Sequence, residues 1–437
     1  MANESTLADR AGVVIQETIY PTMTKNFYRL SRKPWLRYLG VNFEGDYGSG
    51  PTAMGNDDMR VRKIETMNVQ NNQFKVIHNT TAFGGGVQGA DEREALVNGN
   101  YAAQRSTASI KTIQGQFTIS QQAMDVLAQS GSEEIFVNEV LQNTKGATHR
   151  VHKDMNRMLM GDIEGILCYI DGSTSSSVTV TVKTNPTGTA LNEKRAVRHL
   201  HKNDVLFIGT RAQFIAGSGY STVTVSDVTG ATTFTATAAQ TLTDGNLVVR
   251  QNVYSASNAW FKELTGMAAM VATTGTVQGL NKASYEWFQS YSANVGGALA
   301  VSDLTNMLNT VREYADVPND VILVGNQKQW SRYESKIATT KQINYNDFKG
   351  KLAGGIEGLA VYSADGQVPF FIDNDVSDGV IYALDPNGYM LGYTQMLKFL
   401  PPVRSLTALE YINAFYATME HCQLVAQSSG KLTGITS

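Results

Sequence analysis

The last third of the chain constrains the fold most, because it joins a helix-like run to several segments with the apolar character of buried strands. Pro and Gly turns separate these segments, which include VPFFIDNDVSDGVIYALD (368–385) and YMLGYTQMLKFLPPVRSL (389–406). A mixture of helices and strands favours the α+β class. Neither this region nor the rest of the chain shows the spacing of a nucleophile set, a metal cage or a phosphate cradle. We therefore expect a structural protein that acts by assembly, and not an enzyme.

The length and composition indicate a folded chain with a weakly charged surface. At 437 residues the chain exceeds one ordinary domain, so we expect two or three lobes. Hydrophobic residues make up 42% and charged residues 17%, which favours a folded chain over a disordered one. The net charge of −3 gives no overall basic field that points to nucleic acid. A surface rich in Gly, Ser, Thr and Asn suits contact with neighbours or a Thr-rich β domain, and composition leaves both open.

Features that report the cellular compartment predict a soluble protein made in a cytoplasm. The two cysteines, Cys168 and Cys422, lie far apart and form no disulfide framework, so a reducing compartment is expected. The stretch MANESTLADRAGVV lacks the basic and apolar regions of a signal peptide. No apolar run reaches the length of about 20 residues that a membrane-spanning helix needs. We expect no membrane partner.

Two segments in the first quarter have no core of their own. Residues 1–54 alternate helix-like pieces with breakers such as Pro21 and Pro34, and predict an arm. Residues 55–118 contain two stretches of period-two alternation around a Gly-rich middle, and predict a long hairpin with a mobile tip. The second stretch is ASIKTIQGQFTIS (108–120). The alternating positions are Val61, Lys63, Val69, Phe74, Val76, Ile110, Thr112, Gln114 and Gln116. An isolated two-stranded ribbon is marginal in water, so the hairpin needs a neighbour.

The clearest helix is predicted over residues 133–161. Ser132 can cap it, and Glu133 and Glu134 lie in its first turn, where the helix dipole favours negative charge. Apolar or small residues recur at spacings of three and four and form one stripe. They are Val137, Val140, Leu141, Thr144, Ala147, Val151, Met155, Met158 and Leu159.

Residues 171–257 predict a small all-β barrel or sandwich inserted between helical segments. Thr and Val, which favour strands, dominate this block, and turns divide it into short pieces. The pieces are SSSVTVTVKT (175–184), DVLFIGTRAQFI (204–215), STVTVSDV (221–228), TTFTATAA (232–239) and NLVVRQNVY (246–254).

From residue 258 the pattern is mixed. SDLTNMLNTVREYA (302–315) predicts an amphipathic helix with Ser302 as its N-cap. Its apolar side consists of Leu304, Met307, Leu308 and Val311. VPNDVILVGN (317–326) predicts a turn and a buried strand, and NQKQWSRYESKI (326–337) a second helix. Strands follow down to LEYINAFYATMEHCQLVAQ (409–427).

One segment matches the residue pattern of a dinucleotide-binding motif but lacks the sequence context that such a site needs. Residues 84–89 read G-x-G-x-x-G, but a dinucleotide site needs a strand-to-helix turn there and an acid about 20 residues further on. The region 105–113 holds no acid, and no alternating strand–helix pattern surrounds the motif. We favour a flexible hairpin tip, and predict no cofactor.

Three further clusters have residue types that bind ions. His149, His152, His199 and His201, with Cys168 as the nearest thiolate, do not complete a tetrahedral metal site. The loop Asp373–Gly379 is similar to a calcium loop, but its Gly comes one place late and a strand precedes it, so we favour a plain turn. A basic cluster diluted by Glu193 and Asp204 is interpreted as a solvated face in preference to a phosphate contact. It consists of Lys194, Arg195, Arg198, His199, His201 and Lys202. No catalytic, cofactor-binding or metal-ligating residue is predicted.

The order of the segments resembles the tailed-bacteriophage major capsid proteins with the HK97-type fold. The resemblance rests on the succession of four stretches. These are FKELTGMAAMVATTGTVQGLNKASYEWF (261–288), SDLTNMLNTVREYADVPNDVILVGNQKQW (302–330), YALDPNGYMLGY (382–393) and LEYINAFYATMEHCQLVAQSSGKLTGI (409–435). It covers nearly the whole chain outside 171–257.

The resemblance implies a division of the chain into seven parts. Residues 1–54 would be the N-terminal arm, 55–118 the extended hairpin called the E-loop, and 119–170 the peripheral domain with its spine helix. Residues 171–257 would be an inserted β-barrel-like domain. Residues 258–300 would lead to an axial domain at 301–400, and 401–437 would return to the peripheral domain.

The resemblance also implies a function and partners. The chain would self-assemble into pentamers and hexamers of an icosahedral or prolate head shell around phage double-stranded DNA, contacted weakly and without sequence specificity. It would belong to the virion and assemble in the host cytoplasm. Because no long charged helical region precedes the arm, a separate scaffolding protein is expected, with a portal protein and possible decoration proteins as further partners. An encapsulin-like compartment shell, a secreted or surface β-rich adhesion protein and an enzyme remain as alternatives.

Overall fold

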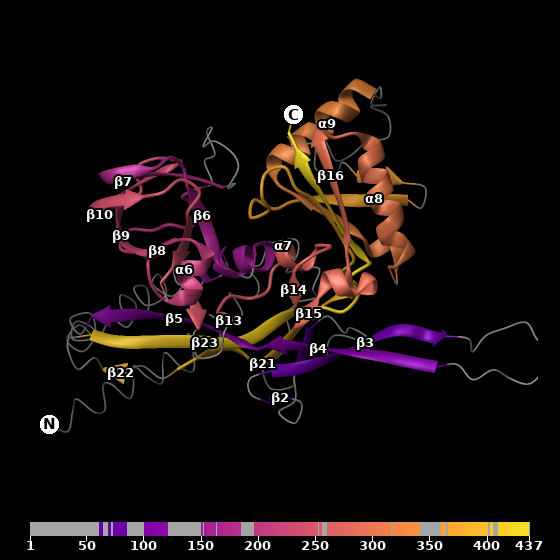
Figure 1. Ribbon diagram of the computed structural model, residues 1–437, viewed down its shortest axis with the longest axis horizontal. Coiled ribbons are helices and arrows are strands. Elements are labelled where there is room, and N and C mark those ends of the chain that lie inside the picture. The colour runs from indigo at the N-terminus through magenta and orange to yellow at the C-terminus, as the bar shows by residue number, and fades with distance from the viewer. Residues whose placement is uncertain are drawn as a thin grey trace, which may run out of the picture. The chain divides into compact units, whose positions relative to one another are not determined.

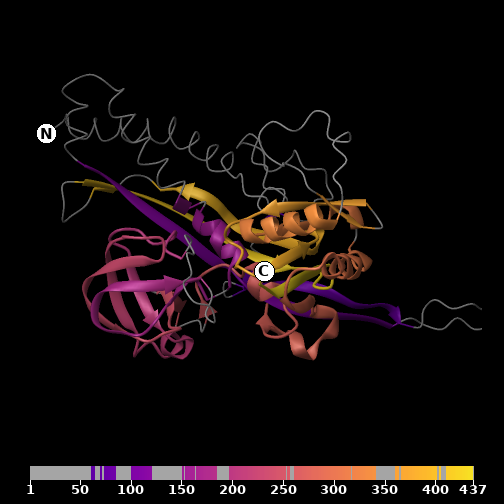
Figure 2. The same cartoon turned by 90° about the horizontal axis from the view of Figure 1, so that it is seen from above.

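Mixed sheets and helices place the chain in the α+β class, as its C-terminal third predicted (Figures 1 and 2). The computed structural model describes residues 61–63, 69–70, 73–84, 100–120, 150–151, 153–162, 164–184, 196–251, 253–255, 260–315, 317–340, 360–363, 366–400, 403–404 and 410–436. Two units divide the chain. Unit 1 comprises Met1–Asp58, Lys111–Gly266 and Gln395–Met419, and unit 2 comprises Met59–Ile110, Met267–Thr394 and Glu420–Ser437. The predicted arm, 1–54, lies outside the described residues.

A closed β-barrel occupies residues 166–250 of unit 1 (Figure 1). Its strands follow the order β10-β7-β6-β11-β8-β9, and every neighbouring pair is antiparallel. Their bounds are Ile166–Ile170 (β6), Thr174–Lys183 (β7), Val205–Gly209 (β8), Ser221–Asp227 (β9), Thr233–Leu242 (β10) and Leu247–Arg250 (β11). A barrel is therefore present where the Thr- and Val-rich block predicted a barrel or sandwich, but it begins before residue 171.

Alternation along the strands builds the barrel core. Val223 and Val225 point inward from β9, while Thr224 between them is half-buried and Thr222 before them is exposed. Phe234 of β10 and Val180 of β7 are register partners and both are fully buried. Each such side chain contributes about 1.5–3 kcal/mol by leaving water.

One of the predicted strand pieces, DVLFIGTRAQFI, is half wrong. It forms β8 and then turns into the helix α6 (Arg211–Ala216). Thr210 is the N-cap: its Oγ1 accepts a hydrogen bond from Gln213 N at 3.4 Å, and Thr210 N donates to Gln213 Oε1 at 2.7 Å. Gly217 closes the helix in the left-handed region, with φ of 70°. This T-x-x-Q capping box is a local signal that the β-rich context concealed.

The predicted helix 133–161 is described only at its end, where residues 150–151 and 153–160 are helical. Met155, Met158 and Leu159 are buried, as the apolar stripe predicted. However, Asp154, Asn156 and Arg157 are buried as well, so this end of the helix is enclosed on more than one side. Unit 1 also contains a long antiparallel pairing of β5 (Lys111–Ser120) with β23 (Glu410–Gln423), from Lys111↔Met419 to Ser120↔Glu410.

Short elements complete unit 1. They are β12 (Tyr254–Ser255), β13 (Trp260–Phe261) and β22 (Val403–Arg404), which pairs with β23.

The pairing of β5 corrects the predicted hairpin. The strand that returns along β3 (Gln73–Gly84) is β4 (Asn100–Ser109), and not the stretch 108–120. The stretch 108–120 has the clearer period-two alternation, whereas residues 100–109 have little, so sequence alone directed the pairing to the wrong stretch. In unit 2 the ribbon β3–β4 is joined by β2 (Val69–Gln70), and β1 (Val61–Lys63) pairs in parallel with β21 (Tyr389–Phe399). Most of the predicted tip, 85–99, lies outside the described residues.

A mixed six-stranded sheet forms the second core of unit 2, with the order β16-β24-β20-β17-β19-β18. Its strands are Tyr291–Gly297 (β16), Ser429–Ile435 (β24), Ile381–Leu384 (β20), Ile322–Gly325 (β17), Gly366–Ile372 (β19) and Ala360–Ser363 (β18). The helices α8 (Val301–Glu313) and α9 (Gln327–Thr340) pack on it (Figure 1). The remaining elements are α7 (Met267–Met270), β14 (Thr276–Val277), β15 (Leu280–Asn281), η3 (Lys282–Ser284), η4 (Glu286–Phe288), η5 (Pro318–Asp320) and η7 (Pro386–Gly388).

The predicted amphipathic helix is confirmed in α8, with one correction. All four predicted apolar residues, Leu304, Met307, Leu308 and Val311, are fully buried. Ser302 is not the N-cap, because the helix begins at Val301 and Ala300 is the cap. Ala300 has no side-chain acceptor, and instead its N–H donates to Asp303 Oδ2 at 3.0 Å. The carboxylate three residues on therefore supplies the cap that Ser302 was expected to provide.

The barrel core gives a direct test. We expect Phe234→Ala to lower the free energy of barrel unfolding by about 3–5 kcal/mol, because it removes a fully buried ring and leaves a cavity. The buried thiol of Cys168 lies in the same core and reports barrel opening through its rate of chemical labelling. Val178→Ala is the matched control, because Val178 is 48% exposed on the neighbouring strand. Equal labelling of Cys168 in the two variants would contradict the assigned core.

Candidate functional site

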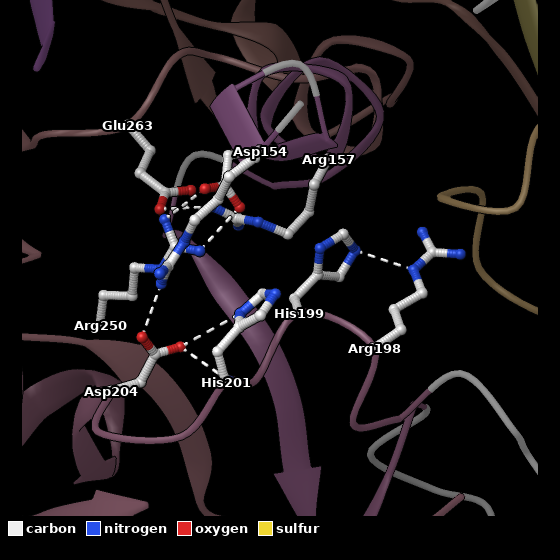
Figure 3. A network of polar contacts seen from close by, with 9 residues as sticks. Asp154, Arg157, Arg198, His199, His201, Asp204, Arg250 and Glu263 are labelled. Carbon is white, nitrogen blue, oxygen red and sulfur yellow. Dashed lines mark hydrogen bonds and ion pairs between the residues drawn. The ribbon is translucent and has the colours of Figure 1, made fainter. Parts of the chain in front are cut away.

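A network of ion pairs in unit 1 joins the helical residues 150–160 to the barrel and to the segment after it (Figure 3). Arg150, Asp154 and Arg157 are spaced at i, i+4 and i+7 and therefore share one helix face. Figure 3 shows Asp154 and Arg157 directed toward Arg250 and Glu263. The sequence pattern predicted an apolar stripe on one face of this helix. It did not predict the buried charged residues that lie between the apolar ones.

Each carboxylate of this network receives a guanidinium. Arg157 Nη2 donates to Glu263 Oε1 at 2.7 Å, and both side chains are buried. Arg250 binds Asp154 with two parallel bonds, Nη1 to Oδ2 at 2.8 Å and Nη2 to Oδ1 at 2.7 Å. This fork geometry is the strong, directional form of an Arg–carboxylate contact. It ties the last residue of β11 to the helix.

A further pair involves Asp204, just before β8. Arg150 Nη2 donates to Asp204 Oδ1 at 2.6 Å, and His201 N donates to Asp204 Oδ2 at 2.9 Å. The Arg150 side chain is 45% exposed, so solvent screens this pair more than the buried one. The network thus extends from a buried ion pair at Glu263 to a partly exposed ion pair at Arg150.

His199 lies within this positive surrounding and is held neutral. Burial is the largest cause that lowers its pKa, and the charges of Arg198, Arg157 and Arg250 lower it further. In the neutral ring Nε2 accepts a hydrogen bond from Arg198 Nε at 2.8 Å. The interpretation of the basic cluster as a solvated face is therefore wrong for His199, which packs inside while Lys202 remains exposed. Lys194, Arg195 and Glu193 lie outside the described residues.

Arg157 stays charged although it is buried. Burial alone would lower the pKa of its guanidinium, but the charge and hydrogen bond of Glu263 raise it above its ordinary value. A permanently charged pair of this kind acts as a joint between elements. With all three carboxylates engaged by Arg side chains, the network offers a mechanical connection and no poised acid or base.

The other clusters weighed from sequence separate in the structure. Within the described residues no group of three or more His, Cys, Asp or Glu side chains is placed to hold a metal. His149 and His152 lie outside these residues, as do residues 85–89 of the glycine motif, whose Gly84 ends β3. Cys168 is buried in the barrel core, and burial raises its thiol pKa far above the usual range.

The acidic loop 373–379 behaves as the predicted turn. Asp375 N donates to Asp373 Oδ1 at 2.9 Å, and Gly379 takes φ of 76°. Lys328 Nζ donates to Asp378 Oδ2 at 2.7 Å, and Gln329 Nε2 donates to Asp378 Oδ1 at 3.0 Å. Burial would raise the pKa of Asp378, but the hydrogen bond and charge of Lys328 and the hydrogen bond of Asn326 hold it below its usual value. The loop carboxylate therefore anchors α9.

A second polar site, missed by sequence reasoning, lies in unit 2 around Lys282. This side chain is fully buried in η3, and its Nζ donates to Phe288 O and to Gln423 Oε1, both at 2.8 Å. Gln423 Nε2 in turn donates to Ser290 Oγ and Ser429 Oγ, both at 3.2 Å. Nothing in the stretch NKASYEWF marks the lysine as buried. The nearby His78 was detectable, because Phe74, Val76 and His78 continue one period-two face.

Comparisons with known proteins find similarity at the level of structure only. No family model and no curated protein matches the sequence. The capsid asymmetric unit of cyanophage A-1(L) is similar with a TM-score of 0.44 and 13% identity, over 86% of this chain and 90% of that chain. The capsid of the native GTA particle has a TM-score of 0.41 and 14% identity, over 91% and 97%. The procapsid of satellite phage P4, which includes the size determination protein, has a TM-score of 0.41 and 9% identity, over 100% and 98%.

The three structures that this chain is similar to are thus capsid structures, those of a cyanophage, of a GTA particle and of a satellite phage procapsid. Among the described residues, no helix combines the length and the apolar character needed to cross a bilayer.

The buried pair Arg157–Glu263 predicts a large asymmetry between single and double substitutions. We expect Glu263→Gln to destabilise unit 1 by about 3–5 kcal/mol, because Arg157 is left buried without a counter-charge. The double variant Arg157→Met with Glu263→Leu should recover most of this loss. Arg150→Ala, which breaks the exposed pair, should cost at most about 1 kcal/mol. Denaturant unfolding of the four proteins measures these values, and equal losses in the Glu263 and Arg150 variants would refute the buried joint.

His199 predicts acid sensitivity with a defined sign. Its folded pKa is lowered, so between pH 6.5 and the folded value the unfolded chain binds a proton that the folded chain does not. Stability therefore falls as pH drops below 6.5, by up to about 1.4 kcal/mol per pH unit for this group. His199→Gln keeps an acceptor for Arg198 and should reduce this slope between pH 6.5 and 5, measured by denaturant unfolding at each pH. The control His201→Gln removes a neighbouring imidazole whose side chain is 40% exposed, and an equal loss of slope in the two variants would contradict the role of His199.

Proposed function

We propose that this chain is the building subunit of a phage-type capsid shell. The observation that supports this most is the ribbon β3–β4, which runs far beyond the third strand that pairs with it. β2 pairs only with Gln73 and Phe74, whereas the β3–β4 register continues to Gly84↔Asn100. A strand of 12 residues spans about 40 Å at about 3.3 Å per residue. Among the described residues, no third strand pairs with the ribbon from Asn79 outward.

A ribbon of this length needs a surface to lie on. Two strands alone bury little and are marginal in water. The root of the ribbon is held inside unit 2 by Phe74, Val76 and Ala108, which share a core with Met390 and Cys422. A rigid root with a long extension suits contact with a neighbouring copy, because many weak contacts made at once in a closed assembly give high effective concentration. Closed symmetry also covers strand edges that would otherwise aggregate.

The finer assignments belong to this proposal. The fold would be of the HK97 type, with an N-terminal arm at 1–54, the E-loop at 55–118 and a peripheral domain with a spine helix at 119–170. An inserted β domain would lie at 171–257, a peripheral-to-axial segment at 258–300, an axial domain at 301–400 and the return at 401–437. Pentamers and hexamers would form the shell of a virion, assembled in the host cytoplasm around double-stranded DNA.

The proposed partners are a separate scaffolding protein, a portal protein, a decoration protein and, above all, further copies of the chain. With a net charge of −3, contact with packaged DNA should be weak and independent of sequence. An encapsulin-like shell would enclose protein instead, so the ratio of nucleic acid to protein in purified particles distinguishes the two.

The ribbon supplies the test. His78 and Gln104 are register partners, so residues 79–103 can be replaced by Asn-Gly, which favours a tight hairpin turn. We expect the unmodified chain to form closed shells in negative-stain electron microscopy, and the shortened chain to remain folded without forming them. Protection of Cys422 in the root core checks the fold.

Ile215→Ser, at a 45% exposed position of α6, is the control for a surface change elsewhere. Closed shells from the shortened chain would refute the role of the ribbon. Failure of the unmodified chain to assemble, alone or with a co-expressed scaffolding protein, would refute the proposed function itself.

A further inference from the structure

Lys282 is a buried base that has no anionic partner among the described residues. Its side chain is fully buried, and its Nζ has two carbonyl acceptors, Phe288 O and Gln423 Oε1, with the Phe288 ring centroid at 4.5 Å. No ion pair of Lys282 occurs within the described residues. Buried lysines without a counter-charge favour the neutral amine, because the ammonium loses its hydration. A neutral amine has two N–H donors, which matches the two carbonyl acceptors present.

Among the described residues packed around Lys282, none forms an ion pair with it. From β24, the charge of Lys431 opposes protonation. From β21, Tyr389 is buried, and burial raises the pKa of its hydroxyl well above the usual range, so it stays neutral. β23 carries the buried Glu420 and His421, but the bond to Lys282 from this strand comes from Gln423. Glu286 of η4 is exposed.

His78 is a second buried base against the same aromatic ring. Its ring centroid lies 5.2 Å from that of Phe288 and 5.4 Å from that of Trp287. Its Nδ1 donates to Leu424 O at 3.0 Å, and its Nε2 accepts from Ser106 Oγ at 2.7 Å, which assigns one neutral tautomer from the network. His78 lies on β3 and Ser106 on β4, so this base ties both strands of the hairpin to the segment that follows β23.

We propose that Lys282 and His78 form a proton-sensitive latch at the root of the β3–β4 hairpin. The latch is closed while both bases are neutral. Proton uptake places two positive charges next to one buried ring, with no anionic partner for Lys282 among the described residues, and the root opens to hydrate them. Opening exposes the small core of Phe74, Val76, Ala108 and Cys422.

The direction of the pH effect follows from burial. Burial lowers the pKa of Lys282 to about 7, with Lys431 as a second cause. Burial also lowers the pKa of His78, opposed by its bond to Leu424 O and reinforced by the charge of Lys282. In the open root each base regains its ordinary pKa, 10.5 for lysine and 6.5 for histidine. Opening therefore takes up a proton at Lys282 between about pH 7 and 10.5, and a further one at His78 below pH 6.5.

The two cysteines make the latch measurable in the full-length chain. Cys422 is fully buried in the root core, and Cys168 is buried in the barrel core of the other unit. Labelling of each thiol by a methanethiosulfonate reagent, divided by the rate of a free thiol at the same pH, gives the opening equilibrium at that site. We expect the normalised rate at Cys422 to fall by up to about tenfold per pH unit from pH 7.5 to 9.5, and Cys168 to show no such decline.

Substitutions separate the latch from general stability. Lys282→Met keeps the length of the side chain but cannot take up a proton, so its Cys422 rate should lose the dependence on pH. Lys262→Met is the matched control at an exposed lysine and should behave as the unmodified chain. A flat Cys422 profile in the unmodified chain, or an unchanged slope in Lys282→Met, would overturn the proposal.

A second measurement covers the case in which Lys282→Met unfolds, seen as fast labelling of both cysteines. Carbon-13 NMR of lysine Cε in the unmodified chain should then show one lysine titrating near pH 7. If every lysine titrates above about pH 9.5, near the ordinary value, the latch is refuted. Each outcome is independent of whether the chain forms shells.

Discussion

The structure depends on one physical constraint. A charged side chain or a backbone polar group that leaves water needs a partner inside the protein. Unit 1 meets it with counter-charges. Arg157 and Glu263 are both buried at a contact of 2.7 Å, and Arg250 holds Asp154 with a two-bond fork. A buried pair of this kind adds little net stability compared with apolar residues, but it specifies one arrangement of helix and barrel, because any other leaves a charge without a partner. The buried pair therefore specifies the geometry of this contact more than it adds to stability.

Unit 2 meets the same constraint in the opposite way. Lys282 is buried against two carbonyl oxygens and an aromatic ring, and no carboxylate among the described residues pairs with it. Its amine therefore favours the neutral form. The same logic applies to His199 in unit 1, where surrounding Arg side chains keep the ring neutral. Buried bases that lack an anion respond to proton concentration near neutral pH, whereas a buried ion pair responds in acid, where its carboxylate takes up a proton. Each unit therefore contains a buried base whose contacts respond to pH, His199 in unit 1 and Lys282 in unit 2.

Sequence patterns predicted what depends on local periodicity and missed what depends on long-range partners. The apolar face of α8 followed from the spacing of Leu304, Met307, Leu308 and Val311, and a barrel or sandwich followed from alternating Thr and Val. The partner of β3 was assigned wrongly, because the stretches 100–109 and 111–120 both suit a strand, and only the whole fold directs the second to β23.

The polar sites escaped prediction for a related reason. Ser302 has the right residue type for a cap, yet Asp303 reaches the backbone first. His199 stands in a basic run that suits solvent, and its burial depends on packing near Arg157 and Arg250, far away in sequence. Lys282 gives no local signal of any kind. The acidic turn at 373–379 was interpreted correctly because its backbone pattern is local.

The closed ring of strands in unit 1 has a consequence for evolution. An open sheet that gains or loses residues at its margin presents new unpaired backbone groups, and so invites unwanted association. In the ring β10-β7-β6-β11-β8-β9 every strand already has two partners. Its turns include Gly172 and Gly245, where no atom lies within 4 Å of an added side-chain carbon. Such turns have room to lengthen or shorten without creating an unpaired strand edge, although φ of 77° at Gly172 and 78° at Gly245 favours glycine at these two positions. Insertions and deletions can therefore accumulate at the turns while the ring of strands stays closed.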